Sequence, residues 1–208
     1  MTTDAGKTKA ETAKAAHERA AYDEAADAYA AAASEYLGAN GLEHAVSAAT
    51  GLRYLLTGAA CLRHRGRRER CRRYCRQGDA ISEEIGDRAQ SLPPEPHAYD
   101  QSVRGVWFEF AGDFRTVGDL PDADAAYDRA AEAYADAGDP ETASFEQFHL
   151  AAAVLPKLLV RGTGADSDDL EAVLRPGATL TEWVAFKRRR LPDLLERLDD
   201  CDEWTYVF

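Results

Sequence analysis

Apolar side chains recur along most of this chain at the spacing of amphipathic α-helices. Ala, Glu, Arg and Leu dominate the sequence and β-branched residues are sparse, so helix is favoured almost throughout. Gly and Pro residues predict breaks near residues 38–41, 64–66, 92–96, 118–121, 138–140, 162–167 and 176–177. The helices between these breaks span about 15 to 25 residues, a pattern typical of antiparallel helical hairpins. We therefore expect an all-α fold.

The clearest repeat unit lies between residues 107 and 130. Large and small apolar residues stand at helical spacing on both sides of a Gly118-Asp119 turn: Trp107, Phe110, Ala111, Phe114, Ala123, Tyr127 and Ala130. This spacing resembles one tetratricopeptide repeat (TPR), in which two helices pack closely through such residues. Weaker, alanine-rich copies over about residues 20–160 also resemble the helical arrays of SNAP-type adaptor proteins.

The resemblance implies that residues 1–161 form antiparallel helical hairpins stacked as a short, TPR-like right-handed superhelix. The pattern stops after Gly162, and residues 162–208 are expected to supply C-terminal capping helices and an aromatic tail. The longer of these helices has an apolar stripe formed by Leu180, Trp183, Val184, Leu191, Leu194, Leu195 and Leu198. The tail, residues 201–208, either folds back onto the array or serves as a linear motif, and folding back is favoured because free aromatic side chains promote aggregation in strong salt.

The amino-acid composition bears on the cellular environment of the protein more than on its fold. The 208 residues carry a net charge of -12, with many arginines and aspartates and few lysines, which resembles the proteins of salt-accumulating halophilic archaea. No apolar run approaches the roughly 20 residues of a membrane span, and the start of the chain lacks the apolar core of a signal peptide. A cytoplasmic protein without membrane contact is expected.

The TPR resemblance also implies a peptide-binding concave face, formed by the first helix of each pair. The helix that precedes Gly118 would present Arg104, Phe108, Glu109 and Arg115 on that face. Chaperone-binding TPR proteins clamp a C-terminal carboxylate with Lys and Asn, whereas Phe108 and Gly112 stand at the corresponding positions here. An exposed Phe108 between arginines would favour an apolar side chain next to an acidic group. The alternative is that Phe108 is buried against a neighbouring helix.

An unusual arginine cluster occupies residues 63–76 of this acidic chain. Its members are Arg63, Arg65, Arg67, Arg68, Arg70, Arg72, Arg73 and Arg76. The segment spans a predicted turn and the start of a helix, where guanidinium forks suit carboxylates or phosphates. Pairing with carboxylates of neighbouring helices is one interpretation, and an acidic protein partner is the next. Nucleic acid is a weaker alternative, because the chain is acidic and Tyr74 is the only aromatic residue of the cluster. The candidate contact residues are Arg67, Arg68, Arg72 and Arg73.

Cys61, His64, Cys71 and Cys75 raise the alternative of a zinc site. On two antiparallel helices, pairs at i/i+3 and i/i+4 could face one another and bind a metal tetrahedrally. The spacing differs from that of common zinc fingers, however, and the three cysteines fall where the repeat requires small buried residues. Buried free thiols are therefore the preferred interpretation, and no cofactor is expected.

A second basic run, residues 187–190, lies beside the apolar stripe of the C-terminal helix and is predicted to be a solvated face. No nucleotide-binding or hydrolase motif is present in the sequence. We therefore expect a non-catalytic adaptor that binds a protein or peptide on its concave face, its arginine-rich turn, or both. The alternatives are a nucleic-acid-associated regulator that uses Arg63–Arg76 and, less favoured, a zinc- or thiol-dependent protein.

Overall fold

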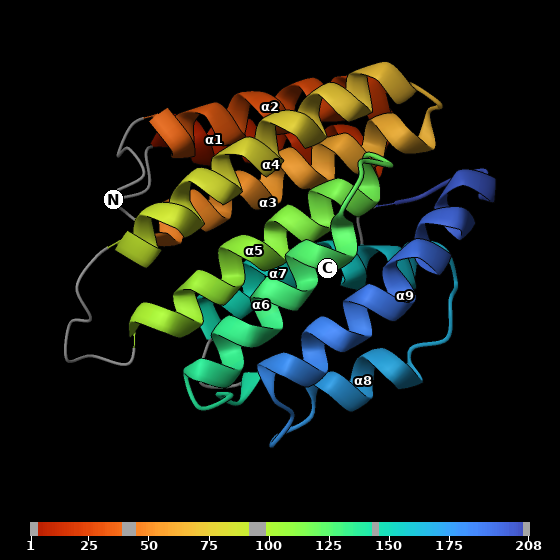
Figure 1. The fold of residues 1–208 in the computed structure, drawn as a ribbon. Helices are drawn as coiled ribbons and strands as arrows, with labels where there is room; N and C mark the ends of the chain where they lie inside the picture. The colour runs from red at the N-terminus through yellow and green to blue at the C-terminus, as the bar shows by residue number, and fades with distance from the viewer. Residues whose placement is uncertain (1–3, 39–44, 92–98, 143–145, 206–208) are drawn as a thin grey trace.

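The computed structural model of the protein describes residues 4–38, 45–91, 99–142 and 146–205 (Figure 1). The helices are α1 (Asp4–Glu18), α2 (Tyr22–Gly38), α3 (Ala45–His64), α4 (Arg68–Ser91), α5 (Tyr99–Val117), α6 (Ala123–Asp136), α7 (Glu146–Gly162), α8 (Asp168–Leu174) and α9 (Leu180–Asp200). Within these ranges there is no strand, and Glu141 and Thr179 form an isolated β-bridge. The predicted all-α fold is confirmed.

The first six helices form three hairpins with the same kind of turn. Each turn contains a residue in the left-handed conformation just after the first helix: Ala20 (φ 56°), Gly66 (φ 66°) and Asp119 (φ 49°). The backbone N–H of the following residue donates to a carbonyl five residues earlier: Ala21 to Ala16 (2.9 Å), Arg67 to Leu62 (2.8 Å) and Leu120 to Arg115 (2.8 Å). This is the hydrogen bond of a Schellman-type helix end. Each helix from α1 to α5 packs against the next one in the chain.

Beyond α6 the order of packing departs from that of a simple stacked array. Helix α7 packs against α3 and α5, and α9 takes the place beside α6 while also contacting α5 and α7 (Figure 1). The predicted apolar stripe of α9 is buried along its whole length. Consequently α5 lies at the centre of the molecule, with α3, α4, α6, α7 and α9 all packed against it.

Helix α3 is another central element. The expectation that no apolar stretch approaches the length of a membrane span is wrong for Ala45–His64, which by length and composition could cross a membrane; 78% of its apolar window is, however, buried inside the structure. Burial of this kind suits the core helix of a soluble helical protein. Among the residues that the structure describes, no other helix passes the same test.

The C-terminal segment folds back onto the helices, as predicted. Trp204 is fully buried; its indole Nε1 donates to the carbonyl of Leu158 (3.1 Å) and its backbone N–H donates to the hydroxyl of Tyr22 (2.7 Å). Gly162 faces the indole ring so closely that a Cβ there would overlap it. Trp204 therefore joins the end of α7 to the α1–α2 hairpin. Residues 206–208 of the tail lie outside the described residues.

Candidate functional site

Arg63 is a structural member of the arginine cluster. Its guanidinium donates to both carboxylate oxygens of Asp199, to Asp119 Oδ1 at 2.9 Å and to the carbonyl of Val117 at 3.0 Å. The residue is only 7% exposed. The buried guanidinium group of Arg63 thus joins the end of α9 and the α5–α6 turn to the end of α3.

Four further members of the cluster also have partners within the molecule. Arg68 donates to Asp199 at 2.8 Å, and Arg70 bridges to Asp23 and Asp27 on α2. The contacts of the other two are longer: Arg67 reaches Asp23 at 3.5 Å, and Arg72 reaches the carbonyl of Gly118 at 3.4 Å and Glu69 at 3.6 Å. Internal pairing therefore accounts for a large part of the cluster.

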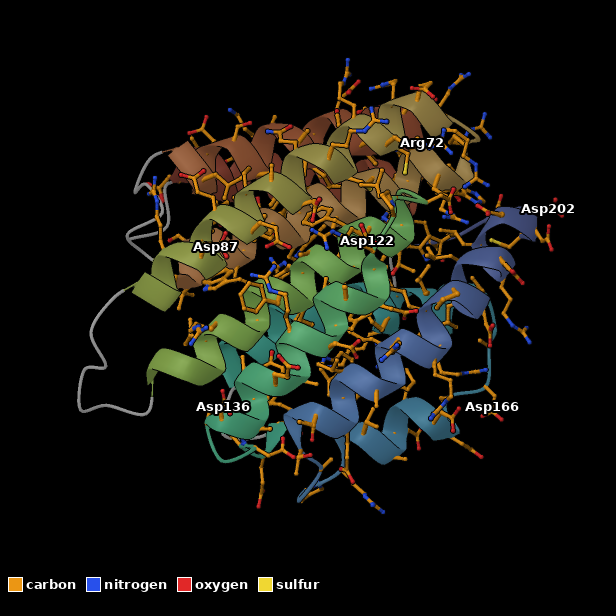
Figure 2. All side chains as sticks on the ribbon, in the orientation of Figure 1. Arg72, Asp87, Asp122, Asp136, Asp166 and Asp202 are labelled. Carbon is orange, nitrogen blue, oxygen red and sulfur yellow. The ribbon has the colours of Figure 1, made fainter. Side chains whose placement is uncertain are left out.

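The remaining members, Arg65, Arg73 and Arg76, are exposed. None of the three forms an ion pair with another residue that the structure describes. Arg73 and Arg76 share one face of α4 because they stand three positions apart. Figure 2 shows Arg72 at the same end of α4, near the α3–α4 turn. The cluster thus separates into an internal part that fastens helices together and an outward part that is free to meet an anionic group.

The candidate residues on α5 do not form an open face. Phe108 is 2% exposed, and a Cβ on Gly86 of α4 would lie 2.6 Å from its ring. The guanidinium of Arg129 on α6 stacks over the same ring, 3.8 Å from its centre. The expectation of an exposed Phe108 is wrong, because α4 and α6 close over this side of α5; the alternative of a buried Phe108 is confirmed.

Arg115 and Arg104 lie in different surroundings on α5. Arg115 donates to Asp79 (2.8 Å) and Glu83 (2.7 Å) of α4 and is largely buried. Burial, opposed by the charge of Arg115, raises the pKa of Asp79. Arg104 is half-buried. The structure therefore does not gather Arg104, Phe108 and Arg115 into one accessible binding surface.

Glu109, the fourth candidate on α5, belongs to a buried ionic network. Its carboxylate accepts from Lys187 Nζ (2.7 Å), Trp183 Nε1 (2.6 Å) and the hydroxyl of Tyr134 (2.6 Å). Lys187 also donates to Asp113, which accepts a further hydrogen bond from Tyr127. The prediction that Lys187 lies on a solvated face is wrong, since its exposed fraction is 0%. A signal was available: Lys187 stands four residues after Trp183 and four before Leu191, within the apolar stripe.

The two carboxyls of this network titrate differently. Burial raises the pKa of Asp113 to about 6, although the charge of Lys187 opposes that shift. Burial acts to raise the pKa of Glu109, but the charge of Lys187 and the hydrogen bonds from Lys187, Tyr134 and Trp183 together lower it. The network holds one lysine and two carboxyl groups. A proton on Asp113 therefore makes the net charge of the three buried side chains zero.

The cysteines and His64 do not converge on one point. His64 Nδ1 lies 2.9 Å from the carbonyl of Leu198, whereas Cys61 lies 3.9 Å from His17. Cys71 and Cys75 are buried on α4, and Cys71 Sγ donates to the carbonyl of Val117 (3.6 Å). Within the described ranges, no group of three His, Cys, Asp or Glu side chains is placed to hold a metal ion. The alternative zinc site is thus not assembled, and the prediction that these three cysteines are buried free thiols is confirmed.

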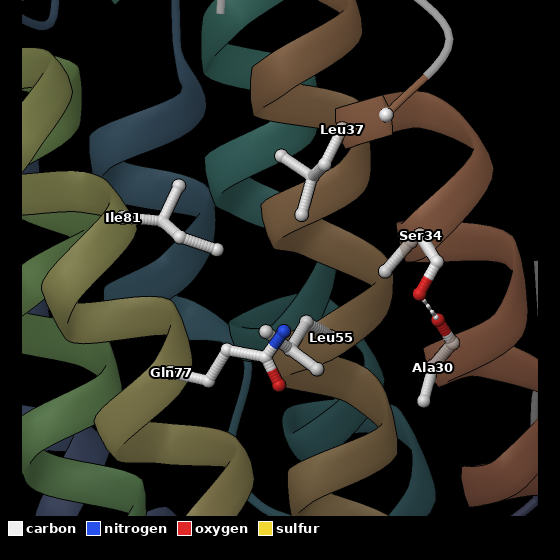
Figure 3. A pocket seen from close by; sticks show the side chains of 8 residues that line it. Ala30, Ser34, Leu37, Leu55, Gln77 and Ile81 are labelled. Atoms are coloured by element: carbon white, nitrogen blue, oxygen red, sulfur yellow. Dashed lines mark hydrogen bonds between the residues drawn. The ribbon is translucent and has the colours of Figure 1, made fainter. Parts of the chain in front are cut away.

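An apolar groove lies between α2 and α4, with α3 at its floor (Figure 3). Its volume is about 320 Å³. The lining side chains come from Ala30, Ala33, Ser34 and Leu37, from Leu55, and from Gln77 and Ile81, with Gly38 at one end. No pattern in the sequence predicts this groove, because it depends on how three helices are placed in space.

In comparisons with known proteins, no protein-family model matches the chain, and no curated protein or solved structure shows significant similarity to it.

Proposed function

We propose that this protein is a non-catalytic adaptor that binds a protein partner through the outward-facing arginines of α4. The observation that carries the proposal is the exposure of Arg73 and Arg76 without internal ion pairs, in a chain whose net charge is -12. In such a chain carboxylates are abundant, and five other arginines of the cluster already use them. Exposed guanidinium groups that find no internal partner suit the carboxylates of another molecule.

This surface replaces the concave face as the proposed contact site. Phe108 and Glu109 are buried, and Arg115 is engaged with α4, so a peptide could reach them only by displacing helices. Arg65, Arg67 and Arg72 lie within the same turn and the first turns of α4 and would extend the contact surface around Arg73 and Arg76.

Affinity capture from the cytosol of the source cells, at its native salt concentration, tests the proposal. The wild-type protein is compared with the double variant Arg73→Gln/Arg76→Gln and with a charge-matched control, Arg19→Gln/Arg175→Gln, which removes two exposed arginines on other elements. A protein retained by the wild type and the control but lost with the α4 variant is the expected result. Identical retention by all three proteins would contradict the proposal.

A further inference from the structure

The groove of Figure 3 lies in the seam between α2 and α4, which is closed at one end and hollow at the other. At the closed end Arg70 pairs with Asp23 and Asp27, and the hydroxyl of Tyr74 donates to Asp27. One helical turn further along, the side chains of α2 are small. Ala30 and Ser34 leave space above Leu55, which forms the floor of the groove and is itself only 2% exposed.

The groove is adjacent to the exposed arginines. Gln77, which lines the groove, stands four residues after Arg73 and directly after Arg76 on α4. A helix rises 1.5 Å per residue, so Arg73 lies about 6 Å from Gln77 along the helix axis. An apolar hollow and two unpaired positive charges are therefore next to each other on one surface.

We infer that the partner contacts this surface with a segment in which an apolar side chain is followed by acidic residues. The apolar side chain occupies the α2–α4 groove, and the carboxylates bind Arg73 and Arg76. This inference rests on the proposed function and specifies the chemistry of the partner. The spacing requires an acidic residue about two positions from the apolar one in an extended segment, or three to four positions away in a helical one.

Charge distribution along α4 sets the orientation of the segment. Beyond Ile81 the next exposed arginine, Arg88, pairs with Glu84 at 2.5 Å, so its charge is offset within the same helix. The unpaired positive charges lie toward the α4 N-terminus. The acidic part of the partner therefore points toward the α3–α4 turn, and its apolar part points toward the C-terminal end of α4.

The same surface is poorly suited to nucleic acid. Tyr74 is 8% exposed and its hydroxyl is engaged with Asp27, so it offers no face for a base to stack on. The side chain of Glu69 is 85% exposed on the turn of α4 that also carries Arg72, where it would repel phosphates. Carboxylates on a protein segment can be placed to avoid Glu69, whereas a phosphate backbone carries a charge at every nucleotide.

Fluorescence anisotropy with defined probes tests this inference. The first probe is a fluorescein-labelled peptide with one leucine, a one-residue spacer and a run of glutamates; the second has serine in place of the leucine; the third is a single-stranded oligonucleotide. They are titrated with the wild type, with Arg73→Gln/Arg76→Gln, and with Ser34→Leu, which fills the groove. Ala172→Leu, at an exposed position of α8, is the control, and circular dichroism checks the helix content of each variant.

We expect the leucine peptide to bind the wild type and Ala172→Leu equally, with the Kd raised about tenfold by Ser34→Leu and about tenfold by the double arginine variant. Equal binding of both peptides, unaffected by Ser34→Leu but weakened by loss of the arginines, would overturn the groove inference and leave the proposed function standing. If the leucine peptide bound the double arginine variant as tightly as the wild type, or did not bind the wild type at all, both the groove inference and the proposed function would be overturned. Tighter binding of the oligonucleotide than of the leucine peptide would overturn the assignment of an acidic protein partner.

Discussion

Lys187 of α9 and Asp113 of α5 form an ion pair 2.5 Å long in which neither side chain has any exposed surface. The same ammonium group contacts Glu109, so one lysine joins α9 to the central helix of the protein at two points. Removing one partner of such a network leaves the others buried without compensation, which costs far more than the net stabilisation that the intact network provides.

Replacing Lys187 with methionine should lower the free energy of unfolding by about 3–5 kcal/mol, because two carboxyls would remain buried without a cation. The neighbouring variant Arg188→Gln is the control. Arg188 is 44% exposed and pairs with Asp124 and Asp128 at the surface, so its loss should cost less than about 1 kcal/mol. Urea unfolding followed by circular dichroism measures both, and equal effects of the two variants would contradict the buried network.

The pH dependence of stability should show the titration of Asp113 most clearly in a variant that lacks His17. Burial shifts the pKa of His17 downward and that of Asp113 upward, so the two residues change stability in opposite directions over overlapping pH ranges. Burial raises the pKa of Asp113 from 3.8 to about 6, so between these values the folded state binds more protons than the unfolded state. In that window this residue makes the free energy of unfolding fall as pH rises. His17→Gln should therefore give a protein that becomes less stable from pH 4 to pH 6, as measured by urea unfolding at each pH.

His17 has the opposite effect in an overlapping window. Burial lowers its pKa from 6.5 to about 4, so the unfolded state binds more protons there and stability is lost as pH falls below 6.5. Asp113→Asn should thus lose stability toward pH 4 more steeply than the wild type, whose two contributions partly cancel. Identical pH profiles of the wild type and both variants would contradict these assignments.

Gly162→Ala should displace Trp204. A Cβ at Gly162 would overlap the indole ring, so the C-terminal segment must move, at a cost of about 1–3 kcal/mol. Tryptophan emission should shift to longer wavelength, since Trp107, Trp183 and Trp204 are all buried in the wild type. Gly38→Ala is the control, because a Cβ at Gly38 meets nothing within 4 Å. An unchanged spectrum of Gly162→Ala would contradict the placement of Trp204.

The two parts of the arginine cluster should respond differently to the same substitution. Arg63→Gln removes the buried fork to Asp199 and Asp119 and should cost about 3 kcal/mol in the free energy of unfolding. Arg73→Gln removes an exposed side chain without an internal ion pair and should change stability by less than about 0.5 kcal/mol. Thermal unfolding of both variants measures the difference, and a large loss of stability in Arg73→Gln would show that this arginine is structural.

Local features of the sequence predicted much of the fold. Gly and Pro marked most helix ends, since both have low helix propensity, although Pro156 and Pro192 stand inside α7 and α9. The turn at Ala20 was not predicted, because the surrounding residues, HERAAYDEA, are all compatible with helix and contain neither Gly nor Pro. Periodicity also identified the buried stripe of α9, and the repeat register placed Cys61, Cys71 and Cys75 in the core.

Features that depend on how distant segments meet could not be predicted in the same way. Phe108 has the same spacing whether a neighbouring helix covers it or not, and the approach of Gly86 and Arg129 is visible only in three dimensions. The division of the arginine cluster depends equally on Asp199, which lies 136 residues after Arg63 in the chain. No local sequence pattern shows that two such distant positions are in contact. The sequence therefore identified the arginine cluster but could not tell which of its arginines form internal ion pairs and which do not.

The central claim is that the outer face of α4 near Arg73 and Arg76 contacts a protein partner. Its most direct test places a photoreactive amino acid at Ala80, an exposed position one helical turn after Arg76, and a second one at Ala172 on α8. After irradiation in an extract of the source cells, we expect a discrete covalent adduct from position 80 that is lost when Arg73→Gln/Arg76→Gln is added, and none from position 172. An adduct from position 80 that survives the arginine substitutions, or the absence of any adduct there, would contradict the claim.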